Sequence, residues 1–138
     1  MKAQLFCGAM LAALLLAALV TTAQTKPGDV VAYIPFSFVV ADRVLPPGSY
    51  IVSAPNDVDL RIYNSQNPGV FVPAHRVQRS TRKTGSKVVF HRYGDTYFLS
   101  QVWVGTSTTG RELFRPAAER ALVNRGAERE IALVTIGK

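Results

Sequence analysis

Apolar and polar residues alternate along much of the chain after residue 29, with the two-residue period of β-strands. A first strand is predicted over residues 30–40, where the alternation places Phe36 and Phe38 on one face. Pro35 has no amide hydrogen to donate, so we expect this strand to lie at an edge or to be bulged. Residues 41–48 are predicted to turn the chain, because they end in Pro-Pro-Gly. Further strands are predicted at 49–54, 60–64 and 70–77, the last containing Pro73 and therefore expected to be a second edge or bulge.

A β-hairpin is predicted over residues 89–103, with Gly94 and Asp95 as its two-residue turn. This register places Arg92 opposite Tyr97, His91 opposite Phe98, Phe90 opposite Leu99 and Val89 opposite Ser100. Strict alternation then divides the side chains between two faces. Arg92, Tyr97, Gln101 and Trp103 are expected on one face, and His91, Tyr93, Phe98 and Ser100 on the other.

The last third of the chain predicts a single helix and a final strand. Residues 105–112 are rich in Gly, Ser and Thr and are expected to be flexible. Pro116 is suited to the first helical position, and Gly126 to the stop that follows. In this helix Ala118, Ala121 and Leu122 form the apolar face, with Glu119 elsewhere. The segment 130–137 is apolar on both sides and is expected to be an interior strand.

Together these patterns predict an all-β, mainly antiparallel fold. About seven short strands fit a small sandwich or a partly closed barrel, with one short helix near the C-terminus. We expect one β-rich domain, at residues 24–138.

The first 23 residues have the composition of a secretory signal peptide. Lys2 precedes an apolar stretch from Leu5 to Val20, which ends in small residues. A membrane anchor is the alternative, but this stretch is shorter than the roughly 20 residues that span a bilayer. We therefore predict export to the periplasm or the extracellular space, with no membrane span after processing. Cys7 is the single cysteine, so the processed domain is expected to contain no thiol.

The formal net charge is +7, and five cations fall between residues 76 and 87 without an acidic residue among them. The plain interpretation is a solvated loop between strands. The functional interpretation is a contact for the phosphate or carboxylate groups of an anionic glycan, a lipid head group or an acidic protein. Nucleic acid is not expected, because the chain is predicted to be exported. The predicted polyanion-binding residues are Arg76, Arg79, Arg82, Lys83 and Lys87.

No motif for catalysis, metal or cofactor is apparent. The two histidines, His75 and His91, lack the spacing of a zinc site, and no Gly-rich loop joins a strand to a helix. His91 is a candidate general base with Tyr93 or Ser100, although a half-buried neighbour of Phe98 is the alternative. A ligand platform of an arginine with aromatic and amide groups is also a candidate, against simple packing. Its residues are Arg92, Tyr97, Gln101 and Trp103.

Four segments carry a resemblance: IPFSF at 34–38, LPPGSY at 45–50, FHRYGDTYFLSQVW at 90–103 and TGREL at 109–113. With these segments the chain resembles a group of small exported acidobacterial proteins of unassigned function, over most of the predicted processed domain. The resemblance implies export and a β-rich domain, and it implies no activity, substrate or catalytic residue.

The sequence therefore favours an exported, non-enzymatic binding or interaction module that contacts anionic groups through residues 76–87. The alternative is a small hydrolase that uses His91 with Tyr93 or Ser100. An outer-membrane barrel is disfavoured, because eight strands of about 9 to 11 residues would nearly exhaust the chain.

Overall fold

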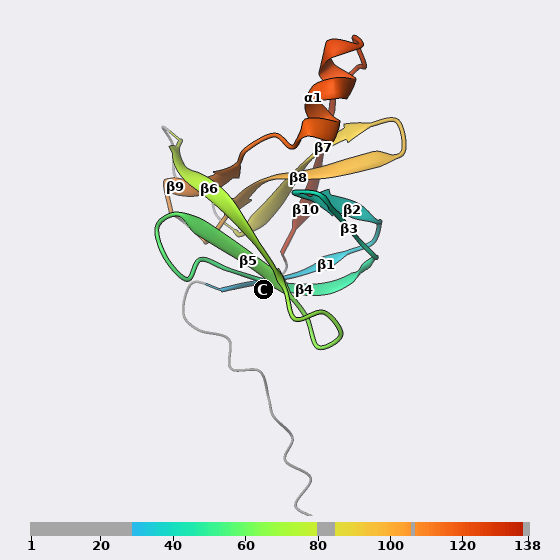
Figure 1. Ribbon diagram of the computed structural model, residues 1–138. Coiled ribbons are helices and arrows are strands. Elements are labelled where there is room, and N and C mark those ends of the chain that lie inside the picture. Colours follow the sequence, from blue (N-terminus) through green and yellow to red (C-terminus); the bar gives the residue numbers. More distant parts are fainter. Residues whose placement is uncertain (1–28, 80–84, 106, 137–138) are drawn as a thin grey trace, which may run out of the picture.

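The chain folds into ten strands and one helix within residues 29–79, 85–105 and 107–136, which are the residues that the computed structural model describes (Figure 1). The predicted signal peptide lies outside these residues. The all-β class with one short helix near the C-terminus is confirmed, with ten strands in place of seven. The elements are β1 (Val30–Ile34), β2 (Phe38–Val40), β3 (Arg43–Leu45), β4 (Gly48–Ser53), β5 (Asp59–Tyr63), β6 (Val70–Gln78), β7 (Lys87–Tyr93), β8 (Thr96–Trp103), β9 (Thr109–Leu113), α1 (Ala117–Asn124) and β10 (Glu130–Thr135).

Three strands were not predicted as separate elements. The predicted strand 30–40 is interrupted after Ile34 and resumes as β2. The predicted turn that follows contains β3, which pairs with β2 in a short hairpin around Ala41, a residue with a positive φ of 53°. The segment expected to be flexible ends in β9, which lies between β6 and β8.

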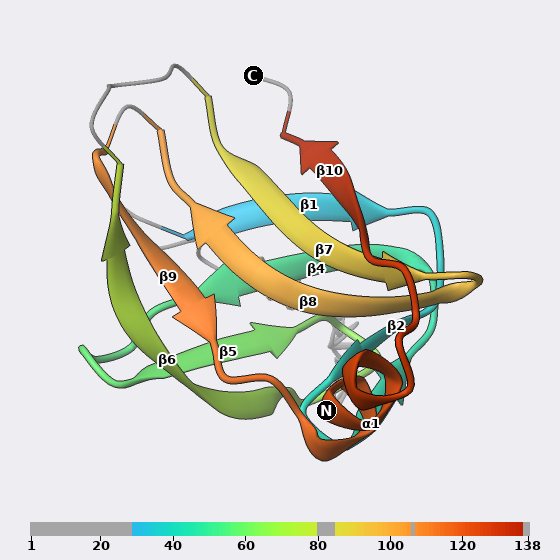
Figure 2. The ribbon, with the colours of Figure 1, turned by 90° about the horizontal axis from the view of Figure 1, so that it is seen from above.

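The strands form one open, curled sheet in the order β1-β4-β5-β6-β9-β8-β2-β3, and β7 and β10 continue from the other side of β8. All pairings are antiparallel except the one between β2 and β8, which meet in parallel at Val39 and Phe98. Figure 2 shows how the strands curl around a common interior, with β10 beside β1. The sheet does not close, and this architecture matches the predicted sandwich-like class.

The curled sheet has two layers, one of β1, β4, β5 and β6 and the other of β6, β9, β8, β7, β10, β2 and β3, so strand β6 belongs to both. Its first half pairs with β5 up to the match of Asp59 with Pro73, and its second half pairs with β9 from the match of Ala74 with Leu113. Pro73 was expected at an edge or a bulge, and it lies instead at the change of partner. A residue without an amide hydrogen is tolerated there, because it falls outside the ladder with β9.

The core lies between the two layers and consists of the inward-facing residues of nearly every strand. Phe38 is central to it, with its ring edge-on to those of Tyr50 at 5.2 Å and Phe90 at 5.6 Å. The hydroxyl of Tyr50 donates a hydrogen bond to the carbonyl of Pro46, 2.6 Å away. Large fully buried side chains include Tyr50, Phe38, Phe90, Ile34, Leu60 and Ile62.

Two expectations about the C-terminal region were wrong. Glu119, expected away from the packed face of α1, is 2% exposed, whereas Ala118 is exposed. Strand β10, expected in the interior, pairs with β7 alone among the described strands, and its residues Ile131 and Leu133 are each 56% exposed. Apolar residues on both sides of a short strand therefore did not indicate a covered strand here. The described part of the chain contains no helix that could span a membrane.

Candidate functional site

The hairpin of β7 and β8 forms as predicted near its turn and departs from the prediction further away. Tyr93 pairs with Thr96 across Gly94 and Asp95, and the predicted pairs as far as Phe90 with Leu99 are present. Val89, however, pairs with Gln101 and not with Ser100. Ser100 is thus the extra residue of a β-bulge, which shifts the alternation of β8 by one residue.

Ser100 lies beside His91, on the face predicted for both, and completes a chain of polar groups under α1. Ser100 Oγ lies 3.1 Å from His91 Nε2, and His91 Nδ1 lies 2.6 Å from Glu119 Oε1. The hydroxyl of Tyr93 donates to the same carboxylate oxygen at 3.0 Å. The side chains of His91 and Glu119 are 12% and 2% exposed, and Ser100 is 5% exposed. We call these four residues the Glu119 network.

Burial and hydrogen bonding act in opposite directions on Glu119. Burial alone would raise the pKa of its carboxyl group, but hydrogen bonds from His91 and Tyr93, with the positive charge of His91 and Arg115, outweigh it and lower the pKa. Burial raises the pKa of Tyr93, and the hydrogen bond to Glu119 raises it further. Glu119 is therefore ionised at neutral pH and can only accept hydrogen bonds.

This charge state fixes the direction of the hydrogen bonds in the network. His91 must donate from Nδ1 to Glu119, so when the ring is neutral its Nε2 accepts from the hydroxyl of Ser100. The order of carboxylate, imidazole and hydroxyl is the order that activates a serine nucleophile. Within the described residues, no group of three or more His, Cys, Asp or Glu side chains could hold a metal ion.

The four residues of the predicted ligand platform do not come together. Arg92 lies over Tyr97, with its guanidinium carbon 5.3 Å from the ring centroid, and Tyr97 stacks on Phe36. Gln101 and Trp103 are on the opposite face, because the bulge reverses the alternation after Leu99. There the Trp103 indole donates to Gln101 at 3.0 Å. The shared face predicted for all four residues was wrong.

A second polar site lies at the open end of the core, where two arginines occupy inward-facing positions. On β6 the buried residues Val70, Val72 and Ala74 alternate along one face, and Arg76 is the next residue in that series. Arg76 pairs with Arg111 on β9, and Arg111 pairs with the buried Val102 on β8. Residues paired in this way share a face, so both guanidinium groups belong to the inner side of the sheet.

The carboxylate of Asp57 lies between the two arginines. Asp57 forms an ion pair with Arg76, and Arg111 Nη2 is 3.5 Å from the same oxygen. Arg111 also donates to the backbone carbonyls of Asn56 and Asp57. The hydrogen bond and charge of Arg76, aided by Arg111, lower the pKa of Asp57. We call Arg76, Arg111 and Asp57 the arginine site.

The other predicted polyanion-binding residues are placed differently. Arg79 lies over the Trp103 ring, with its guanidinium carbon 4.9 Å from the centroid, and donates to the carbonyl of Ser107 at 2.8 Å. Lys87 begins β7 and is half-buried. Arg82 and Lys83 lie outside the described residues. Of the five cations, the structure therefore places Arg76 at an inward-facing site and Arg79 against an aromatic ring.

Sequence reasoning missed three residues of these sites. Arg111 had a usable signal, because the two-residue period of Thr109–Leu113 places it on the same side as an apolar residue, Leu113. Glu119 had none, because its burial contradicts the apolar face of the helix. Asp57 also had none, because its partners are 19 and 54 positions away in the chain.

Comparison with known proteins adds no function to this geometry. No protein-family model, curated protein or solved structure matches the chain. The resemblance to exported acidobacterial proteins stays a prediction.

Proposed function

We propose that the chain is an exported, non-enzymatic binding module that contacts anionic groups at the end of β6. The observation that carries this proposal is the arginine site, where Arg76 and Arg111 face inward and hold the carboxylate of Asp57. Arg76 and Arg111 are paired across β6 and β9, so their two guanidinium groups can bind one anion between them. A position that breaks the packing pattern in this way is more typical of a binding site than of a stabilising contact.

The charge around the arginine site supports the same proposal. Arg79 follows β6 and Lys87 begins β7, and the sequence between them adds Arg82 and Lys83. Because a guanidinium group matches carboxylate, sulfate and phosphate geometrically, the partner classes are an anionic glycan, a lipid head group or an acidic protein. Without Lys2, which belongs to the predicted signal peptide, the net charge is +6, and it would also draw such partners to the surface.

Retention on immobilised heparin and on immobilised lipopolysaccharide, each eluted with a salt gradient, tests this proposal. The variant Arg82→Glu with Lys83→Glu removes two cations without touching a described contact. Its matched control, Arg125→Glu with Arg129→Glu, makes the same charge change at exposed positions near α1. We expect the first variant to elute at clearly lower salt than the control from at least one resin, because fewer counterions are released on binding.

The two resins separate a sulfated glycan from a lipid head group. Equal elution of both variants from both resins would contradict binding through residues 76–87.

A second candidate function, a serine hydrolase, is favoured by one observation. The Glu119 network places a carboxylate, an imidazole and a hydroxyl in hydrogen-bonding order, with the hydroxyl at a β-bulge. In such an enzyme His91 would take the proton of Ser100 as the hydroxyl attacks a carbonyl carbon. The low exposure of Ser100 argues against it, because a substrate must reach the nucleophile.

Labelling with a fluorophosphonate probe distinguishes this candidate from a binding module. A working nucleophile would form a covalent bond from Ser100 Oγ to phosphorus with loss of fluoride, and mass spectrometry would locate the adduct. The variants Ser100→Ala and His91→Gln should then lose the label, whereas Tyr93→Phe should retain it. We expect no label on the folded protein, and an adduct on Ser100 would make the hydrolase the better proposal.

A further inference from the structure

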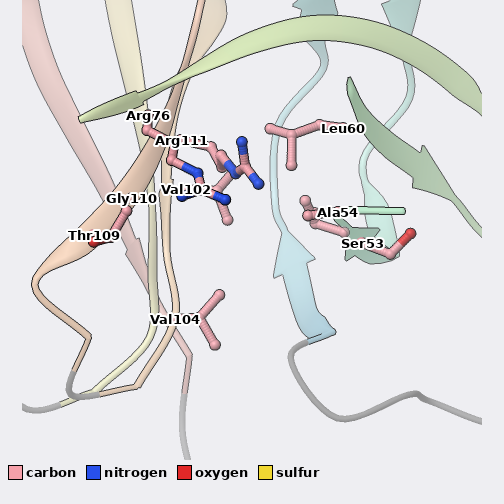
Figure 3. A pocket seen from close by; sticks show the side chains of 10 residues that line it. Ser53, Ala54, Leu60, Arg76, Val102, Val104, Thr109, Gly110 and Arg111 are labelled. Atoms are coloured by element: carbon pink, nitrogen blue, oxygen red, sulfur yellow. The ribbon is translucent and has the colours of Figure 1, made fainter. Parts of the chain in front are cut away.

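Two residues of the arginine site, Arg76 and Arg111, line a small cavity between the two layers. The cavity has a volume of about 120 Å³, and its apolar wall includes Val52, Leu60, Val102 and Val104. Figure 3 shows the guanidinium groups of Arg76 and Arg111 directed into this space, across from Leu60 and Ala54. The cavity therefore offers two cationic groups next to an apolar surface.

The anion that now compensates these cations is easily displaced. Asp57 belongs to the segment between β4 and β5, and its side chain is 76% exposed. When it leaves the arginines, water can solvate its carboxylate at once, so departure costs little. The guanidinium of Arg111 is less free, because its side chain is only 16% exposed and also donates to two backbone carbonyls. Arg111 is thus the fixed part of the arginine site, whereas Arg76, whose side chain is 59% exposed, and Asp57 can both move in solvent.

The volume limits what could replace Asp57. A buried cavity of about 150 Å³ is large enough for benzene, and typical drug-sized ligands need about 300 Å³ or more. A cavity of 120 Å³ therefore suits an apolar group slightly smaller than benzene, such as a short branched alkyl chain. Charge and size together describe a small acid with one anionic group and a compact apolar end.

We propose that this cavity binds a short-chain monocarboxylate, with its alkyl group against Leu60 and Val102 and its carboxylate in the place of the Asp57 carboxylate between Arg76 and Arg111. The inference rests on the proposed function, anion binding at the end of β6, and it adds a small organic acid to the partner classes given there. Asp57 then acts as an internal competitor that occupies the anion position when no ligand is present.

Titration with 3-methylbutanoate, followed by NMR of the arginine Nε–H groups and by calorimetry, tests the inference. We expect saturable binding that shifts the Arg111 signal, and binding of acetate about tenfold weaker or more, because acetate lacks most of the buried alkyl surface. The uncharged 3-methylbutanamide should not bind measurably. Asp57→Asn removes the competing charge at nearly constant shape, so it should bind 3-methylbutanoate more tightly, by no more than about fivefold because the exposed ion pair that it removes is weak.

Three further variants, one of them a control, keep the test decisive if Asp57→Asn is poorly folded. Val104→Phe fills the cavity and should abolish binding, while Val44→Phe, at a position 71% exposed on β3, should bind like the unmodified protein. Arg111→Gln should weaken binding about tenfold or more by removing one charged partner.

The inference is overturned if acetate and 3-methylbutanoate bind equally, if Val104→Phe has no effect, or if 3-methylbutanoate does not bind at all. Heparin or lipopolysaccharide retention that persists in these cases would leave the proposed function standing. Binding of 3-methylbutanoate without retention on either resin would have the opposite meaning, because the cavity would then bind its ligand while the polyanion contact failed.

Discussion

Glu119 and Asp57 are both carboxylates with lowered pKa values, yet they lie in opposite surroundings. Glu119 is 2% exposed and accepts hydrogen bonds from His91 and Tyr93, whereas the side chain of Asp57 is 76% exposed and meets Arg76 and Arg111. Both groups are stabilised in the charged form. The comparison teaches that exposure, not the direction of the pKa shift, separates a carboxylate that holds the fold together from one that can be exchanged.

The largest expected effect is that of Glu119→Ala. This substitution leaves the buried polar groups of His91 and Tyr93 without their acceptor and releases α1 from the sheet. Removing one partner of a buried charged network costs about 3 kcal/mol or more in free energy of unfolding. Urea denaturation measures it, with Glu128→Ala at an exposed position as the control. A loss below about 1 kcal/mol would mean that Glu119 does not anchor the helix.

The second prediction is that Glu119 makes the stability of the fold fall at acidic pH. The pKa of Glu119 is lower in the folded protein than its ordinary value of 4.5, so the folded state binds its proton less readily than the unfolded state. The stabilisation is fully present above pH 4.5 and is lost as the pH falls through the lower, folded-state pKa. Thermal unfolding between pH 6 and 2.5 should therefore show a decline that is shallower in Glu119→Gln.

Asp57→Asn is the matched comparison for this acid experiment. Because Asp57 is exposed and screened by solvent, its variant should keep the pH dependence of the unmodified protein. If the pH dependence of thermal unfolding changed more in Asp57→Asn than in Glu119→Gln, Asp57 and not Glu119 would be the carboxylate that stabilises the fold.

Ser100→Ala should have a smaller effect. Ser100 makes one hydrogen bond, to His91, and His91 keeps its bond to Glu119 when the hydroxyl is removed. We expect a loss of about 1 kcal/mol in free energy of unfolding, typical of a single hydrogen bond. Chemical denaturation of Ser100→Ala and Glu119→Ala under the same conditions gives the ratio of their losses in free energy of unfolding. Equal losses would show that the network acts as one cooperative unit.

The smallest effect is expected for Asp57→Asn under neutral conditions. Exposed ion pairs contribute little to stability, so its unfolding midpoint should match that of the unmodified protein. Differential scanning calorimetry at low and moderate salt is the suitable measurement. A clear loss of stability that disappears at high salt would show that Asp57 is needed to offset the repulsion of Arg76 and Arg111.

The sequence predicted what depends on local pattern and missed what depends on distant contacts. The turn at Gly94 and Asp95, the register near it and the helix after Pro116 followed from residue preferences over a few positions. The bulge at Ser100 could not be predicted, because one extra residue in β8 leaves no local signature and reverses every later side chain. That single shift separated Gln101 and Trp103 from Tyr97.

The two polar sites were hidden for a related reason. Arg76 was singled out for its charge, but its inward direction depends on the alternation of β6 after the change of partner at Pro73. Glu119 was predicted only to lie away from the apolar face of the helix, which is where charged residues are usually found. Both residues become recognisable only when partners 19 and 28 positions away are known.

The double membership of β6 has a consequence for how the protein assembles. One continuous strand of nine residues supplies hydrogen bonds to β5 in one layer and to β9 in the other, so neither layer can be completed before the other has begun. The β9 pairing also joins segments more than thirty positions apart, such as Ala74 and Leu113. Long-range pairing of this kind slows folding and favours an all-or-none transition. Because β6 is shared by both layers, we expect the protein to refold in a single slow kinetic phase and not one layer at a time.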